Sequence, residues 1–208
     1  MAQLAMQSIH VGRPTEALQI ANQVIENEDP SPRVAAVFHL RRARALALMG
    51  DHTRALDEHN RAASVLLGGS SSRNDPAWTW WVDASELAWH RAMSLTALGE
   101  RHAAIDLFRL GYETRPLSAR RARYNDLAHL VEAEVGARAW SDAEPDMEHV
   151  LIDAPDIRSA RTATVLRRAG LAVCRAGPAA PSAASDLSRL VLAGLEEPRG
   201  PLPASEAP

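Results

Sequence analysis

The sequence predicts an all-α fold, an antiparallel solenoid of helical hairpins, from three observations. A motif of a glycine, four mostly polar residues, an alanine and a branched aliphatic residue recurs at 12–18, 50–56 and 99–105. Apolar residues recur every three or four positions on both sides of each glycine, which is the period of a helix buried on one face. No stretch alternates as a strand does. Repeated helix–turn–helix units indicate a stacked array, because each unit needs a neighbour to bury its apolar face.

Ten helices are expected in order along the chain. Apolar spacing, with glycine and proline at the boundaries, places them at 2–11, 14–27, 33–49, 52–67, 83–98, 101–114, 119–136, 141–151, 157–175 and 182–193. The first hairpin turns at Gly12, and Pro14 lies just inside its second helix, where the missing N–H costs nothing. The second hairpin follows the linker 29–32. Its first helix carries an apolar stripe at Ala36, Leu40, Ala43, Ala47 and Leu48.

The later hairpins have their own boundary signals. Asp83 with Glu86, and Ser141 with Glu144, have the spacing of capping boxes. Arg115-Pro116 separates the third hairpin from the fourth, and a loop at 178–182 divides the fifth. We expect residues 1–193 to form one helical repeat domain with an insert loop at 68–82. Residues 194–208 are expected to be a disordered tail.

Composition limits the function classes. The 208 residues are 46% hydrophobic and carry a net charge of −3, which recruits neither nucleic acid nor an anionic membrane. The single Cys174 excludes an internal disulfide and a cysteine-based zinc site, and we expect it to be buried in its alanine-rich helix. No signal peptide or membrane-length apolar stretch is visible, so we expect a cytoplasmic protein. All 23 basic residues are arginine, which we interpret as a GC-rich, bacterial coding sequence.

The repeated unit resembles the tetratricopeptide repeat, in which small residues allow two helices to approach closely. The third unit matches that family at Ala92, Gly99, Ala104, Phe108, Gly111 and Pro116. The second matches at Ala43, Gly50, Ala55 and Ala62, with His59 where an aromatic is usual. A weaker fourth unit offers Trp140, Ala143 and Pro155, but Arg138 replaces the turn glycine. A non-repeating helical bundle is the alternative.

A narrower resemblance covers residues 75–168. It depends on the segments 75–83, 86–90, 121–124, 140–144 and 158–162. Together they are similar to the C-terminal repeat region of actinobacterial Xre-type helix-turn-helix transcription regulators. This resemblance implies a sensory or dimerisation module attached to a DNA-binding head, of which no recognition helix is present here. We therefore expect either a separated sensor domain or a longer product that has lost its head.

The tetratricopeptide resemblance also implies a ligand groove. In that family the first helix of each hairpin lines a concave surface with its second, fifth, sixth and ninth positions. Transferred to the second, third and fourth units, these positions give the candidate ligand-binding residues Arg41, Arg44, Glu86, Trp89, His90, Asn125, His129 and Glu132. Because residues three or four apart share a helix face, we expect them on one surface, suited to an extended peptide. The alternative for each of these residues is that it is an ordinary polar side chain that faces solvent.

Three other features have both a functional and a structural interpretation. The cluster of Trp78, Trp80, Trp81 and Trp89 either forms an apolar pocket or seals the insert against the third hairpin, which we favour. Glu86 and His90 form half a metal site or, as we favour, a local ion pair. A basic run comprises Arg115, Arg120, Arg121 and Arg123. One interpretation is a contact with nucleic acid or an acidic partner, and the other is a solvated turn.

No phosphate loop, nucleophile elbow or paired-carboxylate signature is visible, so we expect no enzyme, no cofactor and no metal. The preferred function is a ligand- or peptide-sensing interaction module of a bacterial transcription regulator. Its expected partner is a peptide or protein, with a homodimer as an open alternative. Contact with nucleic acid or membrane is not expected. The alternative function is a free-standing tetratricopeptide scaffold that docks a partner protein.

We predict that this chain alone does not bind duplex DNA specifically, because it is net acidic and lacks a recognition helix. A fluorescence-anisotropy titration with labelled duplexes in about 150 mM salt measures this. Nanomolar, sequence-dependent binding would contradict the prediction.

Overall fold

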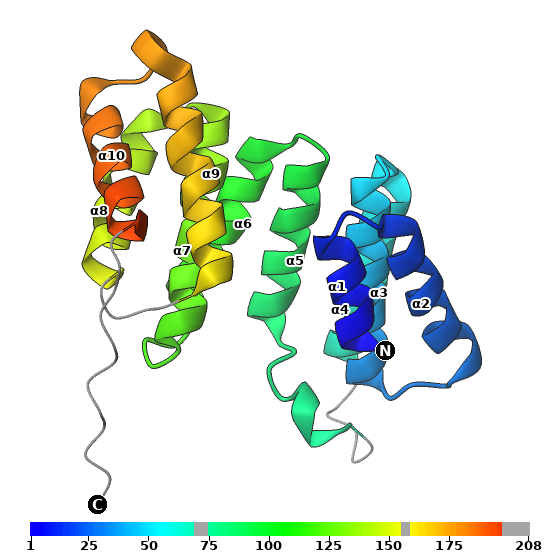
Figure 1. Ribbon diagram of the computed structural model, residues 1–208. Helices are drawn as coiled ribbons and strands as arrows, with labels where there is room; N and C mark the ends of the chain where they lie inside the picture. The colour runs from blue at the N-terminus through cyan, green and yellow to red at the C-terminus, as the bar shows by residue number, and fades with distance from the viewer. Residues whose placement is uncertain (69–74, 155–158, 197–208) are drawn as a thin grey trace, which may run out of the picture.

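The computed structural model describes residues 1–68, 75–154 and 159–196, and within them it is all-α (Figure 1). Its helices are α1 (Ala2–His10), α2 (Pro14–Asn27), α3 (Pro32–Leu48), α4 (His52–Gly68), α5 (Ala84–Ala97), α6 (Arg101–Thr114), α7 (Arg120–Ala137), α8 (Trp140–Asp153), α9 (Ala160–Ala176) and α10 (Ser182–Glu196). Short 3-10 turns lie at Ala77–Thr79 and Gly177–Ala179. The predicted all-α class is confirmed, and each of the ten helices ends within three residues of its expected boundary.

The helices pack mostly against their neighbours in sequence, as expected for an array of hairpins. The first helices of several successive hairpins also contact one another. Helix α3 contacts both α1 and α5, and α7 contacts α9. Among the described helices, α5 and α7 are not a closely packed pair; both lie against α6 instead. Figure 1 shows α1 and α9 on the near side of the row, with α5 between them.

The recurring glycines are explained by the turns within the hairpins. Gly12, Gly50 and Gly99 have φ of 75°, 79° and 88°, in the left-handed region that glycine adopts without steric cost. A Cβ at any of the three would meet nothing within 4 Å, so the backbone conformation alone favours glycine there. Arg138 has φ 60° at the corresponding turn between α7 and α8. The fourth hairpin therefore keeps the turn and accepts an L-residue in a strained conformation.

The alanine of the recurring motif lies where helices approach most closely. Ala17, Ala55 and Ala104 are all 0% exposed, and so is Ala143 of the fourth hairpin. The largest apolar cluster spans α5 to α10 and includes Phe108, Leu127 and Leu166. Smaller clusters join α1, α2 and α3. Small side chains thus set the spacing between helices, and larger ones fill the space between hairpins.

Two predicted helix starts have different outcomes. Asp83 caps α5 as predicted, because its Oδ1 accepts the N–H of Glu86 at 2.9 Å. The capping box at Ser141 is wrong: α8 begins at Trp140 after Ala139 and has no side-chain cap. The expectation for Cys174 is also wrong, because its side chain is exposed while the adjacent Val173 is buried.

The described part of the predicted insert folds back onto the start of α3. The N–H of Arg33 donates to Asp75 Oδ1 at 3.0 Å, and its Nη1 donates to the carbonyl of Thr79 at 3.4 Å. Val82 is buried against Ala36 and Val37 of α3. The described part of the insert therefore packs against the second hairpin, whereas the sequence analysis favoured the third. Residues 69–74 lie outside the described part of the insert.

At the C-terminus, α10 continues three residues beyond the expected 193, to Glu196. Residues 197–208 of the predicted tail lie outside the described residues. No helix in the described ranges is long and apolar enough to cross a membrane.

Ala104 offers a test of the repeat register. Replacing this fully buried alanine with leucine should overpack the helix contact and destabilise the protein by about 1–3 kcal/mol in urea denaturation. Ala103→Leu, on the exposed side of the same helix, is the matched control and should change stability by less than about 0.5 kcal/mol. Equal denaturation midpoints for the two variants would show that the register is wrong.

Candidate functional site

A pocket of about 530 Å³ lies where the first helices of all five hairpins come together. Its lining comes from α1, α3, α5, α7 and α9, with Phe108 of α6 as the single contribution from a second helix. The looser packing between α5 and α7 leaves room for it, and α1 and α9 flank it from the two ends of the row. Its volume lies within the range of about 300–1,000 Å³ typical of ligand sites.

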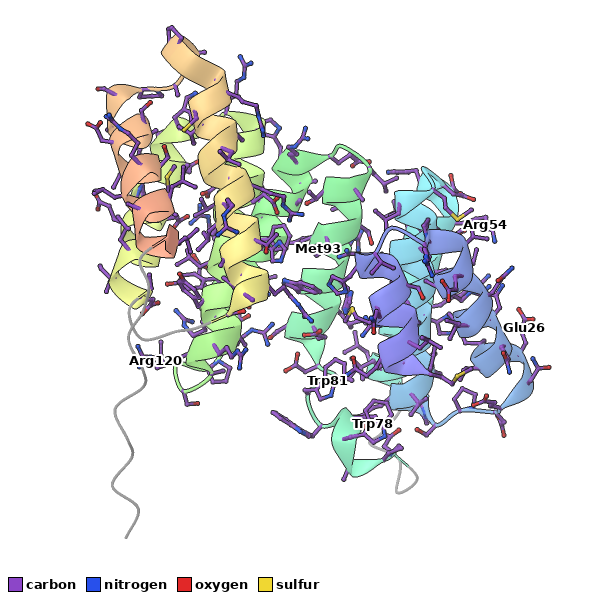
Figure 2. All side chains as sticks on the ribbon, viewed as in Figure 1. Glu26, Arg54, Trp78, Trp81, Met93 and Arg120 are labelled. Carbon is purple, nitrogen blue, oxygen red and sulfur yellow. The ribbon has the colours of Figure 1, made fainter. Side chains whose placement is uncertain are left out.

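Apolar side chains form much of the pocket wall. They include Ile9, Leu48, Trp89, Met93, Phe108 and Val165. Met93 projects from α5 into the space between α5 and α9 (Figure 2). The ring of His129 stacks on Phe108 with centroids 5.7 Å apart and meets Trp89 edge-on at 5.6 Å. These contacts fix the rings, so the wall is built before any ligand enters.

Arg44 of α3 is the distinctive polar group of this pocket. Its residue is only 8% exposed, and its guanidinium lies 5.9 Å from the ring centroid of Trp89. Within the described ranges no carboxylate lies within ion-pair distance of it, and its buried Nε and Nη1 have no hydrogen-bond partner. Burial, followed by repulsion from Arg41, lowers the pKa of Arg44 to about 9. The pocket thus contains a buried cation without a counter-charge.

The rest of the polar lining is also mostly basic. Arg161 and Arg168 reach the pocket from the exposed side of α9. Arg168 is neutralised by Glu132 through two contacts, at 2.8 Å and 3.1 Å. Burial is the largest cause that lowers the pKa of His129, and that of His10 as well. Three arginines against one glutamate therefore leave a net positive pocket in a chain of net charge −3.

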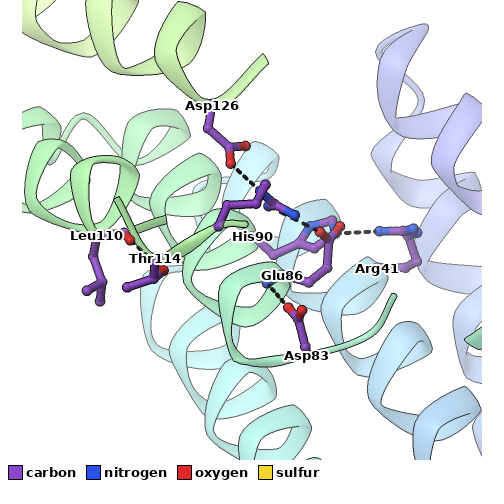
Figure 3. Close-up of polar contacts among 8 residues, drawn as sticks. Arg41, Asp83, Glu86, His90, Leu110, Thr114 and Asp126 are labelled. Carbon is purple, nitrogen blue, oxygen red and sulfur yellow. Dashed lines mark hydrogen bonds and ion pairs between the residues drawn. The ribbon is translucent and has the colours of Figure 1, made fainter. Parts of the chain in front are cut away.

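A buried polar chain runs beside the pocket from α3 to α5 (Figure 3). Arg41 Nη1 lies 3.0 Å from His90 Nε2. A guanidinium can only donate, so His90 Nε2 accepts and the ring proton is assigned to Nδ1, which is buried without a partner. Burial, aided by Arg41, lowers the pKa of His90 well below its usual value. The ring is therefore neutral, although Glu86 Oε1 lies 3.4 Å from Nε2 as the predicted pairing requires.

The charge of Glu86 is balanced by Arg115 instead. Arg115 Nη2 lies 3.8 Å from Glu86 Oε2, and Arg115 Nε donates to Asp126 Oδ2 at 2.6 Å (Figure 3). Burial raises the pKa of Asp126 to about 6, and Arg115 opposes that rise. This cation joins α5 to α7 across the loop that precedes α7. It is a structural tie between the two helices that the pocket separates.

The eight predicted site residues all lie on the first helices, but they do not share one function in the structure. Arg44, Trp89, His129 and Glu132 line the 530 Å³ pocket. Arg41, Glu86 and His90 belong to the buried polar chain, and Arg41 lines a second pocket. Asn125 lines neither pocket; its Oδ1 accepts from Thr162 Oγ1 of α9 at 3.5 Å. The helical period therefore placed all eight on first helices, but it did not give the depth of each side chain.

The four clustered tryptophans separate into different environments. Trp78 and Trp80 are 48% and 77% exposed, while Trp89 lines the main pocket. Trp78 and Trp81 line the second pocket, of about 420 Å³, together with Met1, Ala2, Gln3 and Arg41. Figure 2 shows Trp78 and Trp81 below α1. The cluster is therefore neither one pocket nor one seal.

The predicted basic run is likewise divided. Arg115 is partly buried and ion-paired with Glu86 and Asp126. Arg123 lies 4.3 Å from the ring centroid of Tyr112 and donates to the carbonyl of Arg115 at 3.0 Å. Arg120 contacts Asp153 at 3.9 Å, and Arg121 is exposed. Two of the four cations thus stabilise the turn from within, so the run is neither a continuous basic surface nor a fully solvated turn.

A separate buried acid pair lies away from the pocket. Glu134 of α7 is 0% exposed, and Arg109 of α6 contacts both Glu134 Oε1 at 2.5 Å and Asp146 Oδ2 of α8 at 3.2 Å. Burial, followed by the charge of Asp146, raises the pKa of Glu134 to about 9. The three side chains join three consecutive helices. Within the described residues, no group of three or more potential ligands could hold a metal ion.

Sequence reasoning missed the contributions of the first and fifth hairpins. Ile9 and His10 of α1, and Arg161, Thr164, Val165 and Arg168 of α9, all line the pocket. The α9 residues are spaced by three, four and seven, so the helical period would have grouped them on one face. The predicted groove positions come from the middle three units, so they include no residue of the first and fifth hairpins. Comparison of the chain with protein-family models, curated proteins and solved structures found no match.

The role of Arg115 in joining α5 to α7 can be tested by measuring the free energy of unfolding. Arg115→Met leaves the buried Asp126 and the partly buried Glu86 without their shared cation, and it should destabilise the protein by about 3–5 kcal/mol at pH 7 in urea denaturation. The loss should be smaller at pH 5, because protonation removes the uncompensated carboxylate charge.

Arg13→Met is the matched control for this change. Arg13 and Glu16 form an exposed pair, so the control should cost less than about 1 kcal/mol. If the two variants lose equal stability, Arg115 does not hold α5 and α7 together.

Proposed function

We propose that this protein is an interaction module that binds a peptide or small ligand in the 530 Å³ pocket on the face formed by its first helices. The observation that carries the proposal is the convergence of five helices on one pocket with an apolar wall and an unneutralised buried arginine. A buried charge without a partner is costly, so folding and packing alone do not account for Arg44. Binding accounts for it, because a ligand supplies the missing partner.

The pocket geometry also favours a sensor. Its wall includes side chains from α1 and α9. These two helices are far apart in sequence and lie at opposite ends of the row of first helices. A ligand between them would stabilise one relative arrangement of the outer hairpins, since it can contact both at once. The resemblance of residues 75–168 to the repeat region of Xre-type regulators makes transcription regulation the process that we propose. The repeat type that we propose is the tetratricopeptide repeat, supported by the left-handed turns and the buried motif alanines.

A second candidate is a scaffold that docks a partner protein. The observation that favours it is the exposure of Trp78 and Trp80 on the insert, beside the 420 Å³ pocket. Exposed tryptophans are common anchors at protein interfaces. In this alternative the partner binds at the insert, and a change in the main pocket leaves binding unaltered.

Selection of a random peptide library against the purified chain distinguishes the two. The pocket is blocked by Ala97→Trp, because Ala97 is an exposed lining residue of α5 that can accept a large side chain without disturbing the core. We predict that selected peptides bind the parent and Ala103→Trp equally, and bind Ala97→Trp at least about tenfold more weakly, a loss of about 1.4 kcal/mol.

Binding that survives Ala97→Trp but is lost in Trp80→Ala would favour the scaffold. A helix-turn-helix coding segment directly upstream of Met1 would favour the regulator. Absence of any selected peptide or ligand dependent on the main pocket would contradict the proposed function.

A further inference from the structure

We infer that the ligand of the main pocket is an organic carboxylate, with its charge on Arg44 and its apolar body against Trp89 and Met93. This inference rests on the proposed function, because it names the ligand class of the same pocket. The carboxylate belongs either to a small organic acid or to the C-terminus of a peptide. Both sources present the same planar anion to a guanidinium.

The charge of the ligand follows from what Arg44 lacks. Its residue is more than nine-tenths buried and lines the pocket, and in the described part of the chain no acid pairs with it. Among the lining residues that the structure describes, the acid is Glu132, which Arg168 engages through two guanidinium contacts. Neighbouring Arg41 adds repulsion rather than compensation. An anion from outside the chain is therefore the partner that this position can accept.

A single negative charge suits the pocket better than two. Arg44 is the only unpaired cation among the buried lining residues that the structure describes, since Arg161 lies on the exposed side of α9. The buried His129 has a lowered pKa and so adds no positive charge near neutral pH. A second negative charge at the buried arginine would remain uncompensated in an apolar environment. This favours a carboxylate over a doubly charged phosphate.

The apolar part of the ligand follows from the wall around Arg44. The ring centroid of Trp89 lies 5.9 Å from the guanidinium carbon of Arg44, so a group that pairs with Arg44 also reaches the indole. Met93, Phe108 and Val165 extend the apolar surface toward α6 and α9. A small hydrophilic anion such as chloride would leave this wall in contact with water. An aromatic or branched acid would cover it and gain the free energy of apolar burial.

The test uses a matched pair of fluorescent probes, dansylglycine and dansylglycinamide, which differ in the carboxylate alone. Fluorescence titration of the full chain should show the acid binding about tenfold or more tightly than the amide, as expected for a hydrogen-bonded charge. Arg44→Met should abolish the preference, and the matched control Arg54→Met, exposed on α4, should retain it. Equal binding of acid and amide to the parent would overturn the inference while leaving the pocket as a ligand site.

Two competitors identify the source of the carboxylate. Displacement of dansylglycine by 3-phenylpropionate assigns a small organic acid, and displacement only by N-acetyl-Ala-Ala-Phe assigns a peptide C-terminus. Failure of both to compete would overturn the inference, because the dansyl group would then bind elsewhere. Dansylglycine could also fail to bind while the chain still selects peptides through the pocket. That result would overturn the inference of a carboxylate ligand and leave the proposed function standing.

Stability without ligand gives a readout that does not depend on the probe. Arg44→Met replaces an unpaired buried charge with an apolar side chain of similar length, so its urea midpoint should be higher than that of the parent. A lower midpoint would show that Arg44 supports the fold instead of awaiting an anion, and would overturn the inference.

Discussion

The structure depends on how the interior accommodates the basic side chains of α3. This helix packs against α1, α2, α4 and α5, so its polar residues cannot all reach water. Glu58 of α4 lies 2.7 Å from His39 Nδ1 and 3.4 Å from Arg42 Nε. Neutral His90 of α5 pairs with Arg41. Arg44 has no such partner and lines the pocket, and we propose that a ligand supplies the missing counter-charge.

The rest of the fold sets the space around that charge. Left-handed turns and buried alanines hold the two helices of each hairpin close together. The spacing between hairpins is less uniform, because α5 and α7 both lie against α6 and are joined by Arg115 rather than by close packing. The pocket occupies the resulting space, and α1 and α9 complete its wall. The pocket therefore results from close packing within each hairpin combined with looser packing between α5 and α7.

Features governed by local rules could be predicted from the sequence. Gly50 and Ala55 mark a turn and a close helix contact because each satisfies a requirement of its own backbone. The face that carries Arg44 and Trp89 follows from the helical period. The pairing of Arg41 with His90, 49 residues away, depends on the stacking of two hairpins, which no local pattern encodes. The same reason explains the missed contribution of Arg161, since α9 reaches the pocket only through the tertiary arrangement.

We propose that Arg44 is a buried cation whose partner comes from outside the chain. An anomalous diffraction map from crystals soaked in sodium bromide tests it most directly, because bromide reports where an anion can replace the missing carboxylate. We expect a bromide peak in contact with the Arg44 guanidinium inside the pocket. A map with no peak there, and with Arg44 in an ion pair with Glu132 or another carboxylate of the chain, would contradict this role of Arg44.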